Sequence, residues 1–198
     1  MAHRPTITKH NMIANLEKTQ KNIDFHGTID FLTGTNINYS LLVNPEIIGP
    51  WIQEFWATER AEIEAGEYVI HTTVVGRAIR VTEASMREVL LFDDEGGSVL
   101  FTKQEVWDAL RDIGYEGPLN RITFQKAMVS PHWKYLIHAL LHCLSPKSTT
   151  WDPFGHTISS ALVGLVTNRP FNFSYMILDG MISHIKVGSP FLMYPRFV

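Results

Sequence analysis

The sequence predicts a mainly helical α+β domain with one small β-hairpin near residues 68–81. Apolar residues recur at helical spacing in most segments, several of these segments begin with a capping signal, and only one stretch alternates β-branched and polar residues. The chain has 198 residues, of which 45% are hydrophobic and 19% are charged, a composition typical of a globular protein. We therefore expect a single domain over residues 1–198.

Short helices are predicted before the hairpin. Residues 12–21 carry apolar side chains at helical spacing, followed by charged ones, and residues 29–34 form a second helical turn that ends at a glycine. A longer helix is predicted over residues 45–56, with Asn44 as its N-cap. A Gly-Pro pair interrupts this pattern, so the alternative is that the regular helix begins at Pro50.

The hairpin and the segment after it are predicted to dock as a unit. Residues 68–81 alternate around a turn at residues 74–77, which is typical of two paired strands. Thr82 is placed to cap the next helix, with Met86 on its buried side. An acidic loop over residues 93–97 follows and is expected to be solvated.

The second half is predicted to be dominated by helices, each with its own start signal. The predicted starts are the capping box of Thr102 and Glu105, Ser130 with Pro131, Asp152 with Pro153, and Ser174. The chain finishes in an apolar run over residues 190–198 with no polar ending. This run predicts that the natural chain is cut before its C-terminal boundary.

The charge distribution argues against strong nucleic-acid binding. Lys and Arg number 17 against 20 Asp and Glu, which gives a net charge of −3, whereas sequence-independent binding rests on many phosphate contacts from a basic surface. If the domain does bind nucleic acid, the candidate contacts are Arg77, Arg80, Arg87 and Lys134.

Cysteine usage and hydropathy indicate an intracellular protein. Cys143 is the only cysteine, so an intrachain disulfide is excluded and a reducing compartment fits best. The N-terminus opens no apolar signal region, and no stretch approaches the roughly 18 apolar residues of a membrane span. We expect no membrane association, and the sequence does not distinguish nucleus from cytoplasm.

No residue set matches a catalytic, cofactor or metal pattern. His138 and His142 have the spacing that lets two imidazoles bind one zinc ion, but the glutamate of the metalloprotease motif is missing and Cys143 projects about 100° around the helix. The carboxylates of residues 59–67 are expected to be solvated. We predict a non-enzymatic domain without cofactor or metal; an enzyme whose site only the fold assembles is the alternative.

Large apolar side chains supply a candidate interaction surface. Trp51, Phe55 and Trp56 recur at helical spacing, which favours a place in the core, although such a stripe can also contact a partner. Together with Phe191 and Tyr194 of the apolar C-terminal run, they are the residues we assign to such a surface.

Strings spread along the chain form a family resemblance. They occupy residues 43–58, 81–87, 130–138, 167–174, 179–181 and 191–197. In this order they resemble a plant transposon-associated protein family that accompanies copia-type retrotransposon open reading frames. The resemblance implies a structural or protein-interaction domain, with self-association or other retroelement proteins as partners, and it carries over no catalytic residue. The alternative is a nucleic-acid-binding module of the same polyprotein, although one cysteine cannot form a zinc knuckle.

Overall fold

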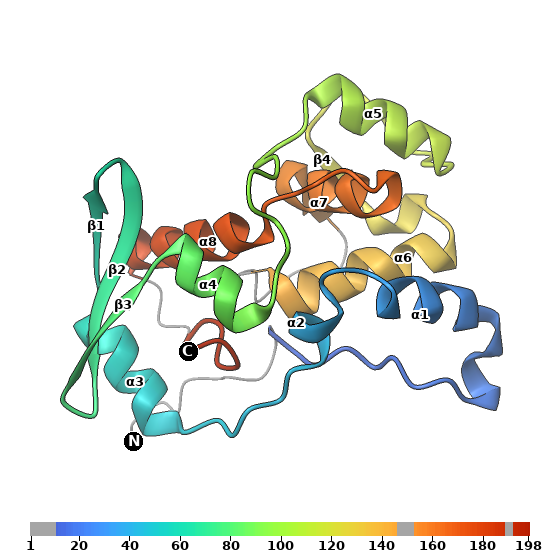
Figure 1. Cartoon of the computed structure of the whole chain (residues 1–198). Coiled ribbons are helices and arrows are strands. Elements are labelled where there is room, and N and C mark those ends of the chain that lie inside the picture. The colour runs from blue at the N-terminus through green and yellow to red at the C-terminus, as the bar shows by residue number, and fades with distance from the viewer. Residues whose placement is uncertain (1–10, 146–152, 189–191) are drawn as a thin grey trace, which may run out of the picture.

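The computed structural model describes residues 11–145, 153–188 and 192–198, and it confirms the mainly helical α+β class. Figure 1 shows a small sheet at one side of the molecule and most of the helices at the other. Among the described residues, no helix combines the length and the hydropathy needed to cross a bilayer.

The segment before the sheet contains short helices. These are the 3-10 helix η1 (Gln20–Phe25) and the α-helices α1 (His26–Thr33), α2 (Asn38–Leu42) and α3 (Gly49–Thr58). The helix predicted over residues 12–21 is wrong, because main-chain N–H groups here bind distant carbonyls: Met12 donates to His142 at 2.7 Å and Ala14 to Leu41 at 2.9 Å. The alternative start of α3 near Pro50 is confirmed.

The sheet is an antiparallel meander of three strands. Its strands are β1 (Arg60–Glu64), β2 (Glu67–Val74) and β3 (Arg77–Val81), in the order β1-β2-β3. The predicted hairpin is β2–β3, whereas β1 lies in a segment that we expected to be a solvated acidic stretch. Both turns have two residues with positive φ, 50° and 89° at Ala65 and Gly66 and 53° and 70° at Val75 and Gly76, which matches the right-handed strand twist.

The remaining helices follow the three-stranded sheet along the chain. They are α4 (Glu83–Leu90), α5 (Lys103–Asp112), α6 (Pro131–Ala139) with the π-helical turn η3 (Leu140–Leu144), α7 (His156–Thr167) and α8 (Phe173–Val187). A second sheet pairs β4 (Thr123–Gln125) with β5 (Pro153–Gly155), and the 3-10 turn η2 (Lys126–Met128) follows β4.

Three of the predicted helix starts are confirmed, and two are wrong. The hydroxyls of Thr82 and Thr102 accept N–H bonds inside α4 and α5, and α6 begins with a proline. Pro153 belongs instead to β5, so α7 begins three residues later, and Asp152 lies outside the described residues. The N-cap of α8 is Asn172, whose side chain accepts from the Tyr175 N–H at 2.8 Å; Ser174 lies inside the first turn.

The core joins the second-half helices to both ends of the described chain. Its largest fully buried rings belong to Phe124, Phe154, Phe171, Phe173 and Tyr194. The ring centroids of Phe124 and Phe154 are 5.5 Å apart, so the small β4–β5 sheet contributes an aromatic pair to this core. In Figure 1 the C-terminal end lies within the outline of the molecule and not at its periphery.

Candidate functional site

The face of the β1–β2–β3 sheet that is turned away from α3 carries a cluster of charged side chains. On the opposite face, the Thr72 hydroxyl donates to the Phe55 carbonyl of α3 at 2.8 Å. Because successive side chains of a strand alternate between faces, His71 of β2 points away from α3. The register places Arg80 of β3 directly beside His71, and Glu62 of β1 is a diagonal neighbour of His71.

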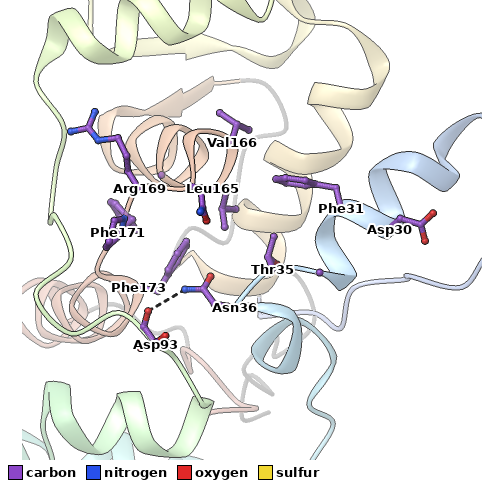
Figure 2. Close-up of a pocket in the computed structure, with 14 residues that line it drawn as sticks. Asp30, Phe31, Thr35, Asn36, Asp93, Leu165, Val166, Arg169, Phe171 and Phe173 are labelled. Atoms are coloured by element: carbon purple, nitrogen blue, oxygen red, sulfur yellow. Dashed lines mark hydrogen bonds between the residues drawn. The ribbon is translucent and has the colours of Figure 1, made fainter.

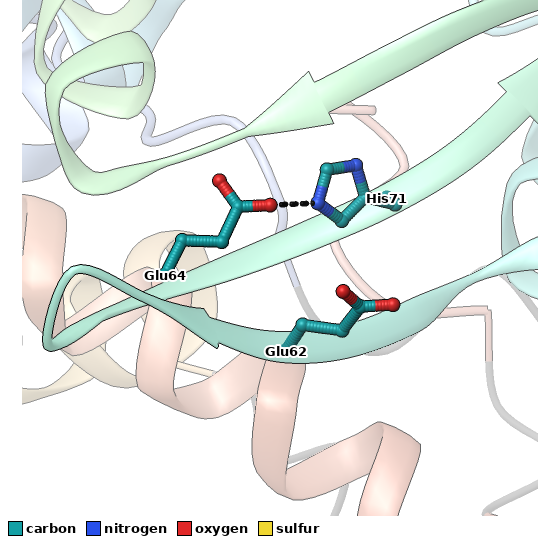
Figure 3. A group of neighbouring side chains, drawn as sticks. All are labelled: Glu62, Glu64 and His71. Atoms are coloured by element: carbon teal, nitrogen blue, oxygen red, sulfur yellow. Dashed lines mark hydrogen bonds and ion pairs between the residues drawn. The ribbon is translucent and has the colours of Figure 1, made fainter.

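Glu64 is the centre of this cluster, which Figure 3 shows in part. Its Oε1 lies 2.6 Å from His71 Nε2, and its Oε2 accepts from Arg80 Nη2 at 2.7 Å and Nε at 3.2 Å. The hydrogen bonds from Arg80 and then from His71 lower the pKa of the Glu64 carboxyl below its ordinary value. One ligand atom each of Glu62, Glu64 and His71 lie within 4.8 Å of one another, so three metal-type donors converge here.

A groove of about 800 Å³ lies on a different part of the molecule. Figure 2 shows Phe31 of α1 on one side and Arg169, Phe171 and Phe173 on the other. Two buried phenylalanines, Phe171 and Phe173, form part of its lining, and the Phe31 ring is 37% exposed at its rim. The groove therefore combines an apolar floor with a polar edge.

Most polar groups of the groove already have partners. Asn36 donates to the main-chain carbonyl of Asp93 at 3.3 Å, and Asp30 forms an ion pair with Lys18. Arg169 is bound to Glu105 at 2.8 Å. The described lining residues include no nucleophile beside a base, so this geometry fits a contact surface better than a reaction centre.

The tryptophans of α3 have different environments. The Trp51 side chain is 48% exposed, whereas Phe55 is only 2% exposed and belongs to the core. Trp56 is half-buried and donates its indole N–H to the Met193 carbonyl at 3.1 Å. The expected interaction surface is therefore wrong for Phe55, and Trp56 instead fastens the C-terminal segment to α3.

The C-terminal run does not extend this surface. Tyr194 is fully buried and donates its hydroxyl to the Leu144 carbonyl at 3.1 Å. Phe191 lies outside the described residues. Tyr194 was expected to be exposed because it stands in an apolar run near the chain end, but that run packs into the core.

The four candidate nucleic-acid contacts do not form one patch. Arg77 and Arg80 lie three residues apart on one strand and so point to opposite faces, and Arg80 is neutralised by Glu64. Arg87 is bound to Glu83 at 2.5 Å and to Asp94 at 2.6 Å. Lys134 is exposed on α6, far along the chain from the sheet.

The two histidine rings of α6 and η3 lie close together and are tilted relative to each other. The ring centroids of His138 and His142 are 3.9 Å apart with an interplanar angle of 31°. The group of neighbouring metal-type ligands found among the described residues does not include this pair. Burial raises the pKa of the Cys143 thiol to about 11, so the neighbouring sulfur stays protonated at neutral pH.

Two buried charged residues with several hydrogen bonds were not predicted from the sequence. Asp94, in the loop expected to be solvated, is 1% exposed and accepts hydrogen bonds from Arg87 and Ser174. Arg196 is buried among main-chain carbonyls. Ser174 lies 80 residues from Asp94 in the sequence, and Asn11 lies 185 residues from Arg196. No local pattern therefore signals either role.

Known proteins supply no functional analogy for these sites. Comparison with protein-family models, with curated proteins and with solved structures returns no match. The geometry of the described residues and the resemblance found in the sequence are therefore the basis for proposing a function.

Proposed function

We propose that the chain is a non-enzymatic protein-interaction domain that associates with further copies of itself through the edges of its sheet. The observation that carries this proposal is that β1 and β3 are both edge strands. No main-chain hydrogen bond outside the sheet involves either strand among the described residues. Free edges of this kind are templates for another strand.

The two hairpin turns identify the groups that face outward. A two-residue turn is flanked by a pair that exchanges main-chain hydrogen bonds, and bonded and non-bonded pairs alternate along an antiparallel ladder. In β3 the bonded pairs therefore include Arg77 and Ile79, so the N–H and C=O of Ala78 and Arg80 point to the free edge. In β1 the bonded pairs include Glu62 and Glu64, so the N–H and C=O of Ala61 and Ile63 point to the free edge.

Charge and exposure favour a second copy of this chain as the occupant. Arg77 of the β3 edge and Glu62 of the β1 edge have no ion pair among the described residues, so each is available to an opposite charge on a second copy. The Ile63 side chain is 66% exposed and adds apolar contact area. Pairing β3 of one copy with β1 of the next is a head-to-tail contact, which adds subunits into an open filament or a ring.

The family resemblance supports the wider proposal that this domain belongs to a retrotransposon-derived plant protein. A domain that joins copies of itself fits a structural role in such a protein. The alternative nucleic-acid role draws no support from the geometry, because its candidate arginines are separated or paired with carboxylates.

The test is molar mass by light scattering over a range of protein concentrations. We expect mass to rise with concentration for the natural sequence and to stay at one subunit for Ala78→Pro. Proline removes only the outward N–H of residue 78, so the β2–β3 ladder and the far-UV circular dichroism should be unchanged. Ala78→Val keeps that N–H and serves as the control that still associates.

Mixing two blocked variants adds a sharper outcome. Ala78→Pro retains the β1 edge, and Ala61→Pro retains the β3 edge, so each alone should be monomeric while an equimolar mixture forms a dimer through one intact junction. The proposal would be overturned if the natural chain were monomeric at every concentration. It would also be overturned if a single proline variant associated as strongly as the natural chain.

A further inference from the structure

We propose that Glu62, Glu64 and His71 bind a divalent transition-metal ion, such as Zn²⁺, on the face of the sheet turned away from α3. This inference does not depend on the proposed self-association. It rests on the convergence of two carboxylate oxygens and one imidazole nitrogen from neighbouring strands (Figure 3).

The donor set selects the class of ion. One imidazole and two carboxylates are ligands that Zn²⁺ and its first-row neighbours accept, whereas Mg²⁺ and Ca²⁺ prefer oxygen alone. Three protein ligands leave coordination positions for water. The ligands stand on two hydrogen-bonded strands, so the ladder holds them in a common register.

Two observations indicate that a cation belongs in this cluster. The Glu62 carboxylate has no ion pair or hydrogen bond among the described residues, although an oxygen of Glu64 lies within 4.8 Å of one of its own. Arg80 compensates the charge of Glu64 but not that of Glu62, and a bound cation would remove the repulsion that remains between the two carboxylates. Glu62 is exposed, so it can turn toward the ion without loss of packing.

Arg80 does not block the site. It binds Glu64 through Oε2, while Oε1 faces His71 Nε2. Oε1 and Nε2 are 2.6 Å apart, whereas two ligand atoms about 2 Å from a tetrahedral ion are roughly 3.3 Å apart, so the Glu64 carboxylate and the His71 ring must separate slightly to admit the ion. Arg80 can then stay in place and orient the Glu64 carboxylate, as hydrogen-bonded outer residues do around many metal ions.

The test is isothermal titration of the full chain with Zn²⁺ alone, with Mg²⁺ as the comparison ion. Because the chain has nine histidines, the site must be separated from other binding. We expect a Zn²⁺ event that Mg²⁺ does not produce and that weakens by roughly tenfold or more in Glu62→Gln and in His71→Gln. His138→Gln, which alters the histidine pair of α6 and η3, is the matched control and should retain the event.

Cobalt gives an independent readout: four-coordinate Co²⁺ held by nitrogen and oxygen ligands absorbs visible light much more strongly than hydrated Co²⁺, and this added intensity should be lost in His71→Gln. Far-UV circular dichroism checks that the variants remain folded. If His71→Gln unfolds the chain, Glu62→Gln still tests the site, because the Glu62 side chain has no described partner to lose. Zn²⁺ binding that is unchanged in both variants, or absent in the natural chain, would refute the site. Loss of self-association has no bearing on this outcome.

Discussion

Arg196 binds Asn11 from the opposite end of the described chain through two hydrogen bonds. Its main-chain N–H donates to Asn11 Oδ1 at 2.8 Å, and its Nε donates to the Asn11 carbonyl at 2.8 Å. The guanidinium also reaches the carbonyls of Ser40, Val43 and Cys143. These carbonyls lie at the C-terminal ends of α2 and η3, where helix carbonyls lack intrahelical partners and attract cations.

Replacing Arg196 with methionine should destabilise the fold strongly. Methionine keeps an apolar stem but leaves several buried carbonyls without donors, so we expect a loss of about 3 kcal/mol or more in the free energy of unfolding. Urea denaturation measures it. Arg77→Met is the control: Arg77 is exposed, and the change should stay within about 0.5 kcal/mol. Equal effects of the two substitutions would contradict this role of Arg196.

The two tryptophans of α3 should respond differently to alanine substitution. Trp56 contacts Phe55 at 5.0 Å and His184 at 4.6 Å between ring centroids and binds the Met193 carbonyl, so Trp56→Ala should cost about 3 kcal/mol. Trp51 is half-exposed, and Trp51→Ala should cost less than about 1 kcal/mol. Thermal and urea unfolding compare them; the reverse ranking would show that the C-terminal segment is not fastened through Trp56.

Asp94 should matter far more for stability than its neighbour Asp93. The Asp94 carboxylate accepts from Arg87 Nε at 2.6 Å, the Ser174 N–H at 2.7 Å and the Ser174 hydroxyl at 3.0 Å. Asp94→Asn removes the charge that faces Arg87 and should cost about 3 kcal/mol. Asp93→Asn is the matched control, because Asn36 binds the main chain there and that bond survives. Similar melting temperatures for both variants would exclude the buried network as a source of stability.

Local signals explain which elements the sequence could predict. Thr82 and Thr102 cap their helices through hydrogen bonds that span three residues, and the β2–β3 hairpin depends on a turn of two residues. Such features are encoded within one short segment. Residues 12–21 have a helical pattern, yet bonds to His142 and Leu41 decide their conformation, and no local pattern contains those partners.

The same reasoning applies to the sites. Arg77 and Arg80 are neighbours in sequence, but strand alternation places them on opposite faces. Glu62 and His71 are nine residues apart, and only the antiparallel pairing of β1 with β2 brings them together. Proximity in sequence therefore suggested a basic cluster that does not form, and it gave no signal for the metal-type cluster that does.

His138 should make the stability of the fold depend on pH in the acidic range. Partial desolvation, the adjacent His142 ring and then Lys126 lower the pKa of His138 from 6.5 to about 4, although the residue remains exposed at the surface. Between these two values the unfolded chain binds a proton that the folded chain does not. The contribution of His138 to stability is therefore intact above pH 6.5 and is lost progressively as the pH falls toward 4.

The measurement is urea denaturation of the natural chain and of His138→Gln at a series of pH values from 7 to 4. The natural chain should lose stability more steeply than the variant over this range, because glutamine does not titrate. His184, whose pKa burial also lowers, contributes to both curves and cancels in their difference. The ring-proton signal of His138 should titrate near pH 4 in NMR spectra. Parallel stability curves, or a midpoint at 6.5, would show that His138 is charged as easily in the fold as in the unfolded chain.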